Sequence, residues 1–183
     1  MILFVNACVR SSSRTKRLAD FVLGTLDGDI KEIRLEDTVF PHADEDFILR
    51  RSELAASGDF SDGIFDLAKD FAAAGTIVIA APFWDLSFPS SLKQYIEQVC
   101  VTGLTFTYRD NRPVGLCRAE KLIYITTAGG YISSYDYGFG YIREIACIFF
   151  GIPEVKFVSA EGLDIIGADT EAILKSAEER FLS

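Results

Sequence analysis

The sequence predicts an α/β fold in which five parallel strands form a sheet with helices on both faces. Short, almost wholly apolar runs recur along the chain, as expected for strands that are covered on both faces. Segments with apolar residues at helical spacing lie between these runs. Strand and helix alternate strictly, and this alternation is typical of a parallel sheet.

The first half of the chain provides three of the strands. We expect them at residues 2–5, 30–35 and 76–81. One helix begins at Ser13 and ends before Gly28, and a weaker helical pattern covers residues 47–54. Ser61 is a candidate N-cap for the helix that precedes the third strand.

The second half continues the alternation. A helix follows Pro89, and two further strands are expected at residues 122–126 and 155–160. Residues 105–116 predict a hairpin or a lid rather than core. The last two helices are expected around residues 141–149, before a stop at 151–153, and around 173–181. With no repeat or linker, we expect residues 1–183 to form a single domain.

Five strands in this order favour the flavodoxin-like arrangement, with sheet order 2-1-3-4-5. Strands one, three and four are then neighbours. The loops that follow them must converge on one crevice at the carboxyl edge of the sheet, where open α/β sheets bind their ligands.

The first of these loops places hydroxyl groups and the guanidinium of Arg10 at the amino end of a helix, around Ser13 and Thr15. Free N–H groups and the positive helix end favour a phosphate there. The alternative is ordinary N-capping by one serine. The chain has no GxGxxG after the first strand, which argues against a dinucleotide-binding Rossmann site.

The second loop carries the flat side chains Phe83, Trp84 and Phe88. Their number predicts a planar ligand, and we infer a flavin. The alternative is that they only pack the end of the sheet. The third loop contains Gly129 and Gly130, which allow the backbone to approach a ligand closely, although they also suit a tight turn.

Composition excludes several classes of function. The net charge of −9 argues against nucleic acid or an anionic membrane as a partner, and no apolar run approaches membrane-spanning length. We expect no signal peptide and a cytoplasmic location. Four separated cysteines with no CxxC pair, and His42 as the single histidine, argue against a zinc or iron–sulfur site. In a cytoplasmic chain we expect reduced thiols, with Cys100 and Cys147 buried among apolar groups.

An ordered set of motifs resembles a known family. These motifs are residues 82–89, 102–108, 113–116, 127–130 and 160–162. They follow one another as in the FMN-dependent NAD(P)H:quinone oxidoreductases, a family that includes bacterial azoreductases. The resemblance covers nearly the whole chain and is strongest from residue 76 to residue 162.

The resemblance implies FMN as cofactor, NADH or NADPH as electron donor, and a quinone or azo compound as acceptor in a two-electron ping-pong reaction. The flavin carries the chemistry, so no catalytic side chain is assigned. The resemblance also implies that three groups of residues bind the cofactor: Arg10, Ser13 and Thr15 at the phosphate; Pro82, Phe83, Trp84, Asp85 and Leu86 along the isoalloxazine; and Thr127, Ala128, Gly129 and Gly130 at its far edge.

The substrate side is implied to lie near Phe106, Tyr108 and Tyr131, with residues from a second subunit. A homodimer would also cover a set of aromatic residues that one small crevice cannot bury: Phe106, Tyr108, Tyr131, Tyr135, Tyr137 and Phe139. Two rival interpretations stay open. One is a flavodoxin-type electron carrier without a substrate of its own, and the other is a non-catalytic binding module.

The chain departs from the family pattern in two places. It has Trp84-Asp85 where azoreductases usually have Tyr-Asn, and its shorter first loop has Cys8 near a usual serine. A carboxylate at position 85 would disfavour an anionic reduced flavin if it faced the ring. Alternatively, Asp85 serves only as a turn residue.

Overall fold

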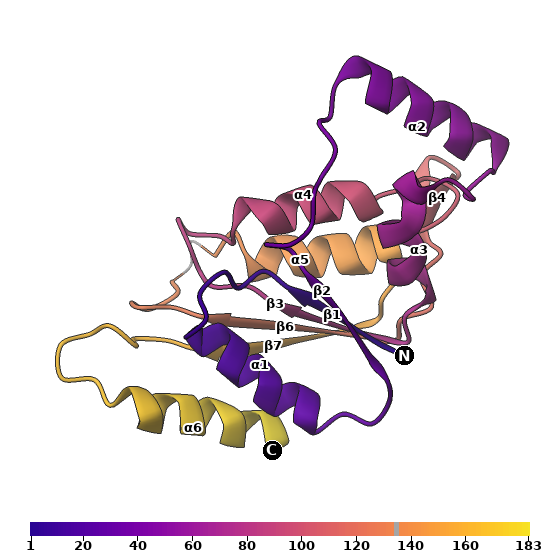
Figure 1. Ribbon diagram of the computed structural model, residues 1–183. Coiled ribbons are helices and arrows are strands. Elements are labelled where there is room, and N and C mark those ends of the chain that lie inside the picture. The colour runs from indigo at the N-terminus through magenta and orange to yellow at the C-terminus, as the bar shows by residue number, and fades with distance from the viewer. Residues whose placement is uncertain (134–135) are drawn as a thin grey trace.

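The computed structural model of the chain describes residues 1–133 and 136–183 (Figure 1). Five parallel strands form one sheet in the order β2-β1-β3-β6-β7. Their bounds are Ile2–Asn6 (β1), Ile30–Arg34 (β2), Thr76–Ala80 (β3), Lys121–Thr127 (β6) and Glu154–Ala160 (β7). Numbered within this sheet alone, the order is 2-1-3-4-5, so the predicted flavodoxin-like topology is confirmed.

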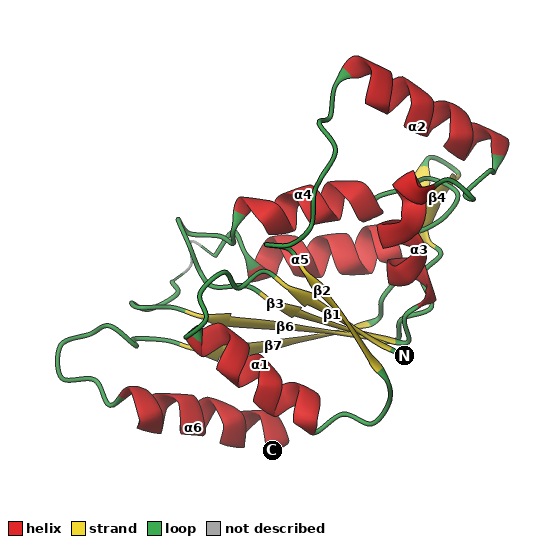
Figure 2. Ribbon diagram, viewed as in Figure 1, coloured by secondary structure: helices red, strands yellow, loops and turns green. Residues whose placement is uncertain are grey.

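Helices cover both faces of this sheet (Figure 2). One layer holds α1 (Arg14–Gly24) and α6 (Thr170–Leu182), and the other holds α3 (Asp66–Ala73), α4 (Ser90–Val99) and α5 (Phe139–Ile145). In β1, Leu3 and Val5 belong to the core under α3, α4 and α5, while Ile2 and Phe4 belong to the core under α1 and α6. Successive side chains of a strand point to opposite faces, which is why the central strands β1, β3 and β6 are mostly apolar, whereas the edge strand β2 carries Lys31, Glu32 and Arg34.

The strand registers bring the important loops to one edge. Asn6 lies beside Ala80, and Ala80 lies beside Ile125. The chain therefore leaves β1, β3 and β6 at nearly the same level. Ser13 begins α1 as predicted, because its hydroxyl accepts a hydrogen bond from the Lys16 amide at 3.2 Å.

Helix α2 (Glu45–Ser57) is longer than the predicted segment and projects from the body of the molecule (Figure 1). The carboxylate of Asp44 caps its start, and Gly58, with φ of 73°, ends it. None of its residues is fully buried, which explains its weak apolar pattern. Arg51 fastens it to α4 by donating to the carbonyls of Glu97, Gln98 and Cys100 at 2.9, 2.9 and 3.0 Å.

The predicted N-cap at Ser61 is wrong by one residue. Asp62 accepts from the Ile64 amide at 3.0 Å and begins a short 3-10 turn, η1 (Gly63–Phe65), which leads into α3. The hydroxyl of Ser61 instead donates to Asp59 at 2.6 Å. A carboxylate is as good a cap as a hydroxyl, so the residue whose geometry suits the turn takes the role.

Residues 105–116 form a hairpin, as predicted. Strands β4 (Phe106–Arg109) and β5 (Arg112–Gly115) pair antiparallel through a turn in which Asp110 and Asn111 have φ of 50° and 59°. The expectation that this segment stays out of the core is wrong at its base. Phe106 is 6% exposed and packs edge-on against Phe149, with the ring centroids 4.9 Å apart.

Helix α5 continues into a π-helical segment, η2 (Ala146–Phe150), which Gly151 ends with φ of 71°. The expectation that Cys147 is buried is wrong, because this residue lies on the outward side of that segment. Cys100 is only partly buried, and all four cysteines are free thiols.

Candidate functional site

The loops after β1, β3 and β6 enclose a cavity of ≈ 410 Å³ at the carboxyl edge of the sheet. The sequence predicted this meeting of three loops. The lining residues are Val9, Arg10, Ser12, Ser13, Arg14, Thr15, Pro82, Phe83, Trp84, Thr127, Gly129 and Asp164. Eight predicted cofactor-binding residues are among them. Asp85, Leu86, Ala128 and Gly130 lie in the same loops but do not line the cavity.

One end of the cavity has the chemistry of an anion site. The backbone N–H groups of Arg14 and Thr15, which have no partner within α1, are there, together with the hydroxyls of Ser12 and Ser13. Arg10 is exposed, and within the described residues its guanidinium makes neither a hydrogen bond nor an ion pair. A free guanidinium beside a helix N-terminus favours a phosphate or a carboxylate.

Cys8 supports this loop from below. Its amide donates to the side-chain oxygen of Asn6 at 3.0 Å, and its thiol lies 3.8 Å from the carbonyl of Ala80. Burial raises the pKa of the Cys8 thiol, so the side chain stays neutral in the floor of the loop. Packing therefore accounts for Cys8, and the residue does not line the cavity.

A buried hydrogen bond joins the first and third loops. The hydroxyls of Thr15 and Thr127 lie 2.6 Å apart, and Thr15 is almost fully buried. The Thr15 hydroxyl thus bonds to another loop of the protein. Farther along, Phe83 donates its amide to the carbonyl of Thr127 at 3.1 Å, which joins the second loop to the third.

The second loop is a tight turn from Trp84 to Ser87. Its two ends exchange backbone hydrogen bonds of 3.1 and 2.8 Å, and its central residues Asp85 and Leu86 have φ of 51° and 65°. Left-handed φ at both central positions is the type I′ geometry, which costs a non-glycine residue roughly 1–2 kcal/mol. Asp85 therefore has a role as a turn residue.

The aromatic residues of this loop separate into two groups. Phe83 and Trp84 line the cavity, and Trp84 is 38% exposed at its mouth. Phe88 instead packs against Tyr141, with the ring centroids 5.8 Å apart, beside the core under α4 and α5. The packing interpretation is therefore correct for Phe88, which does not line the cavity.

A fourth loop, residues 161–169 after β7, adds Asp164 to the cavity wall. The amides of Gly162, Leu163 and Asp164 donate to carbonyls of the third loop at 2.9, 3.2 and 2.9 Å. Sequence reasoning missed Asp164. The motif at residues 160–162 marked this loop, but no local pattern showed which side chain would turn toward the cavity.

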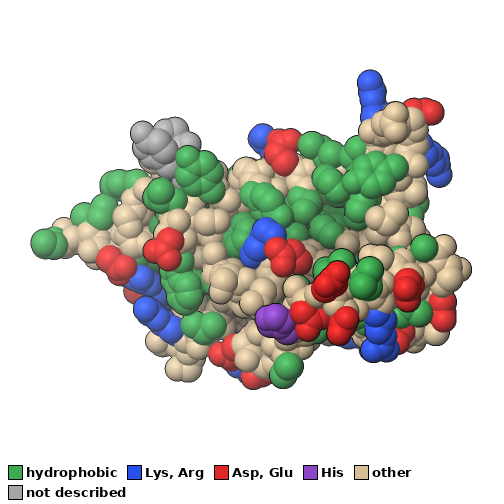
Figure 3. Space-filling view, turned by 90° about the horizontal axis from the view of Figure 1, so that it is seen from above, with side chains coloured by type: hydrophobic (Ala, Val, Ile, Leu, Met, Phe, Trp, Pro, Cys, Tyr) green, Lys and Arg blue, Asp and Glu red, His purple; other side chains and the backbone are tan. Residues whose placement is uncertain are grey.

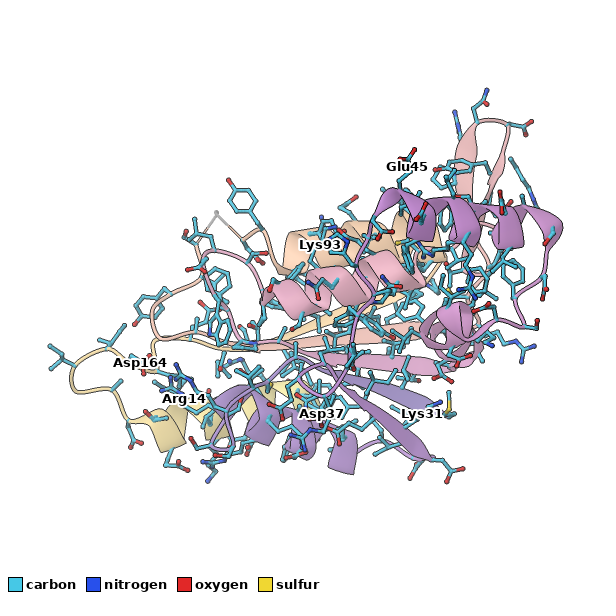
Figure 4. The ribbon with its side chains drawn as sticks, turned by 45° about the horizontal axis from the view of Figure 1, so that its top comes forward. Arg14, Lys31, Asp37, Glu45, Lys93 and Asp164 are labelled. Carbon is cyan, nitrogen blue, oxygen red and sulfur yellow. The ribbon has the colours of Figure 1, made fainter. Side chains whose placement is uncertain are left out.

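Asp164 forms an ion pair with Arg14, which is the first residue of α1. The Nη1 atom of Arg14 lies 2.8 Å from a carboxylate oxygen of Asp164 (Figure 4). Hydrogen bonding from Arg14 lowers the pKa of Asp164, with the positive charges of Arg14 and Arg10 acting in the same direction. The carboxylate of Asp164 therefore stays charged at neutral pH.

The predicted substrate-side residues separate into two places: Phe106 and Tyr108 lie together, with ring centroids 5.6 Å apart, whereas Tyr131 lies beside Gly162 of the fourth loop. The hairpin with Phe106 and Tyr108 sits at the amino edge of the sheet, because α4 carries the chain back across it (Figure 1). At this edge Gly115 packs against the backbone of Phe150 and Gly151, just before β7. The hairpin therefore does not lie over the cavity of its own chain.

Other aromatic residues of the predicted set have different surroundings. Tyr131 is largely exposed beside the fourth loop, and Tyr137 is also exposed. Phe139 stacks on Phe157 with ring centroids 4.4 Å apart, so it belongs to the core layer. Tyr135 lies outside the described residues.

Comparison with known proteins places the chain in a family. A family model described as the flavodoxin-like fold matches residues 1–183. The chain belongs to this flavodoxin-like family. Among curated proteins, this flavodoxin-like protein is 43% identical over 122 residues to an FMN-dependent NADH:quinone oxidoreductase 2 of Clostridium acetobutylicum. That alignment covers 64% of the present chain and 60% of the relative.

Two further matches extend the comparison. An FMN-dependent NADH:quinone oxidoreductase of Lachnoclostridium phytofermentans is 36% identical over 140 residues, which cover 72% of the flavodoxin-like protein and 70% of that relative. The structure of an FMN-dependent NADH-azoreductase from Bacillus anthracis in complex with FMN superposes with a TM-score of 0.82. It is 22% identical, with 98% and 94% of the two chains covered, and this likeness concerns the fold.

The described residues contain neither a candidate membrane-spanning helix nor a candidate metal-binding cluster. No helix there is both long and apolar enough to cross a membrane. Nor does the described part of the chain contain a group of three or more His, Cys, Asp or Glu side chains that could hold a metal ion.

Proposed function

We propose that this flavodoxin-like protein is an FMN-dependent oxidoreductase that passes electrons from NADH or NADPH to a quinone or azo compound. One observation carries the proposal. A single cavity has an anion-binding end, with Arg10 and the start of α1, and a flat apolar wall, with Phe83 and Trp84. FMN has a terminal phosphate and a planar ring system. The curated relatives are FMN-dependent NADH:quinone oxidoreductases, which supports the same cofactor, donor and acceptor class.

The residues of the cavity fit the cofactor. Arg10, Ser12, Ser13 and the first amides of α1 would hold the phosphate, since they supply charge and several donors. Pro82, Phe83 and Trp84 would lie along the ring system, while the third loop, at Thr127 and Gly129, would provide backbone groups at its edge. The volume of ≈ 410 Å³ is that of an ordinary cofactor pocket.

Bound FMN would supply the redox chemistry, relaying two electrons from the nicotinamide donor to the acceptor. The chain itself would bind, orient and shield. Phe83 and Trp84 would exclude water from one side of the cavity. The two backbone hydrogen bonds between Trp84 and Ser87 hold Trp84 in place. The sequence contains one histidine, His42, and it does not line the cavity. His42 is exposed and lies 3.7 Å from Asp44, so the serines at the anion end have no histidine beside them. Protons would therefore come from water or a nearby hydroxyl.

We expect ping-pong kinetics. Donor and acceptor would use the same mouth, beside the exposed ring of Trp84, so that each excludes the other. Initial rates at several fixed acceptor concentrations should give parallel double-reciprocal lines. Intersecting lines would show a ternary complex and contradict this part of the proposal.

The protein is also proposed to be a homodimer. Tyr141 and Ile148 are exposed on the helical layer that contains α4 and α5, where Figure 3 shows hydrophobic side chains gathered. If a twofold axis passed through this layer perpendicular to its helices, the helices of the partner would run in the opposite direction. The partner's hairpin, at the amino edge of its sheet, would then approach this chain's cavity, at the carboxyl edge. Such an arrangement would place Phe106 and Tyr108 beside the substrate of the other subunit.

Light scattering at micromolar concentration tests the assembly, and a fully active monomer would contradict it. Replacing Tyr108 by Ala should raise the KM for a quinone without weakening FMN binding, if the hairpin walls the partner's cavity. For the location we propose the cytoplasm, which suits four free thiols.

A flavodoxin-type electron carrier is the second candidate function. The specific observation in its favour is that the hairpin leaves the cavity of its own chain open. The purified protein should be yellow in both cases. Oxidation of NADH that is stimulated by menadione supports the enzyme, whereas a flavin that is reduced only by a partner protein supports the carrier. A colourless protein that binds no added FMN would refute both.

A further inference from the structure

Two arginines line the cavity, and they differ in what they already bind. Arg10 is without a hydrogen-bond or ion-pair partner among the described residues. Arg14 donates from Nη1 to the carbonyl of Leu163 at 3.2 Å and to the carboxylate of Asp164 at 2.8 Å. Figure 4 shows Arg14 and Asp164 next to each other at this end of the molecule. Both hydrogens of that nitrogen are therefore used within the protein.

The position of Asp164 is fixed from a second direction. Its amide donates to the carbonyl of Gly129 at 2.9 Å, and its carboxylate lies directly over that glycine. A Cβ atom at position 129 would come within 2.3 Å of a carboxylate oxygen of Asp164. The glycine thus makes the space that lets Asp164 reach Arg14.

These contacts close a ring around the cavity. Arg14 joins α1 to Asp164, Asp164 rests on Gly129, and the third loop returns to α1 through the bond between Thr127 and Thr15. If the ion pair were absent, the fourth loop would keep its backbone bonds to the third loop, the bond from the Ile132 amide to Glu161 at 2.8 Å and the buried side chain of Leu163. It would lose the two hydrogen bonds from Arg14 that hold it to the start of α1 at the cavity wall.

We propose that Arg14 and Asp164 form a latch that holds the fourth loop against α1, and that Arg10, rather than Arg14, is the arginine that binds the phosphate of the cofactor. The proposal rests on the proposed function, because it assumes FMN as the ligand. Arg14 and Asp164 are positioning residues. Their opposite charges largely cancel at a distance, so Arg10 supplies the net positive charge at the anion end.

The test compares FMN with riboflavin, which has the same ring system and no phosphate. The double variant Arg14→Gln/Asp164→Asn removes the latch without changing the net charge. The dissociation constants of both ligands should rise together by about two- to fivefold, which is the range expected for a partly exposed ion pair. Arg10→Gln should raise the constant for FMN by about tenfold, as loss of a charged hydrogen bond predicts, and leave riboflavin unchanged.

The chain offers a matched control on the same helix. Arg17 forms two hydrogen bonds with Glu171, at 2.6 and 2.7 Å, which tie α1 to α6 away from the cavity. Arg17→Gln/Glu171→Gln makes the same charge-neutral change. Both ligands should bind this variant as they bind the unaltered protein.

Three results would overturn the proposal. Weaker binding of FMN but not of riboflavin in the Arg14/Asp164 variant would make Arg14 a phosphate ligand. Unchanged binding of both ligands would show that no latch operates. Equal weakening of both ligands by Arg10→Gln would refute the phosphate assignment.

Hydrogen exchange of the ligand-free protein provides a second measurement. The amides of Leu163 and Asp164 should exchange faster in the Arg14/Asp164 variant and at the normal rate in the control variant. If the unaltered protein binds neither flavin, the proposed function fails and the assignment of Arg10 fails with it. Faster exchange would still support the latch, and unchanged exchange would overturn it.

Discussion

The hydroxyls of Thr15 and Thr127 lie 2.6 Å apart in the floor of the cavity, where helix α1 meets the end of strand β6. These residues are 112 positions apart in the sequence, and both are nearly inaccessible to solvent. Each hydroxyl is the hydrogen-bond partner that the other would otherwise lack. The bond therefore belongs to the structure that shapes the cavity.

Replacing either threonine by valine should destabilise the protein by about 1–3 kcal/mol, because the remaining hydroxyl is left buried without a partner. The double variant Thr15→Val/Thr127→Val should recover much of this loss, since no polar group is then stranded. Urea unfolding of the three variants measures the effect. Strictly additive losses in the double variant would contradict this account of the pair.

Adding a methyl group at Gly129 should disturb the cavity wall, whereas the same change at Gly130 should not. Gly129→Ala forces the carboxylate of Asp164, which is bonded to Arg14, to move, while the Cβ position at Gly130 has no atom within 4 Å. We expect Gly129→Ala to cost roughly 1–3 kcal/mol if the fourth loop has to shift. Thermal unfolding and flavin titration compare the two variants, and equal behaviour would refute the prediction.

Glycine at position 86 should stabilise the protein. Leu86 has φ of 65°, a conformation that costs a residue with a side chain roughly 1–2 kcal/mol. Glycine avoids this cost, but it makes the unfolded chain more flexible, which offsets part of the gain. The expected gain for Leu86→Gly is about 0.5–1 kcal/mol, and Leu86→Ala, which keeps the Cβ atom, should not share it. A loss of stability in the glycine variant would mean that contacts of the Leu86 side chain stabilise the protein by more than its backbone conformation costs.

Asp85→Asn isolates the charge of the neighbouring turn residue, because asparagine also tolerates left-handed φ. If the carboxylate acts on the flavin, the midpoint potential of FMN should rise on the order of tens of millivolts. An unchanged potential would leave Asp85 with its backbone role in the turn.

The ion pair of Asp164 should contribute stability at neutral pH that is lost in acid. The pKa of this carboxyl is lowered in the folded protein, so its contribution is complete above its usual pKa of 3.8 and is lost as the pH falls through the lower folded value. The stability difference between the unaltered protein and Asp164→Asn should be constant from pH 5 to 7 and shrink below about pH 4. Unfolding curves across this range check it, and a difference that grows in acid would contradict the sign.

The sequence was sufficient for the fold because strand and helix patterns are local. Apolar runs such as residues 76–81 can hardly form anything but covered strands, and strict alternation leaves few topologies for a parallel sheet. Once the order of the strands is set, the three loops must meet. Eight of the twelve predicted cofactor-binding residues line the cavity for that reason.

Only the tertiary structure decided which side chains of those loops turn inward. Asp164 comes from a loop more than thirty residues beyond Gly129, and its place on the cavity wall depends on a backbone contact that no sequence pattern records. The same is true of the two arginines, which look alike in sequence and differ because one meets a carboxylate and the other does not. Local periodicity therefore determined the sheet and its loops. Packing between distant segments decided the partner of each polar group, because hydrogen bonds and ion pairs depend on position in space rather than on order in the chain.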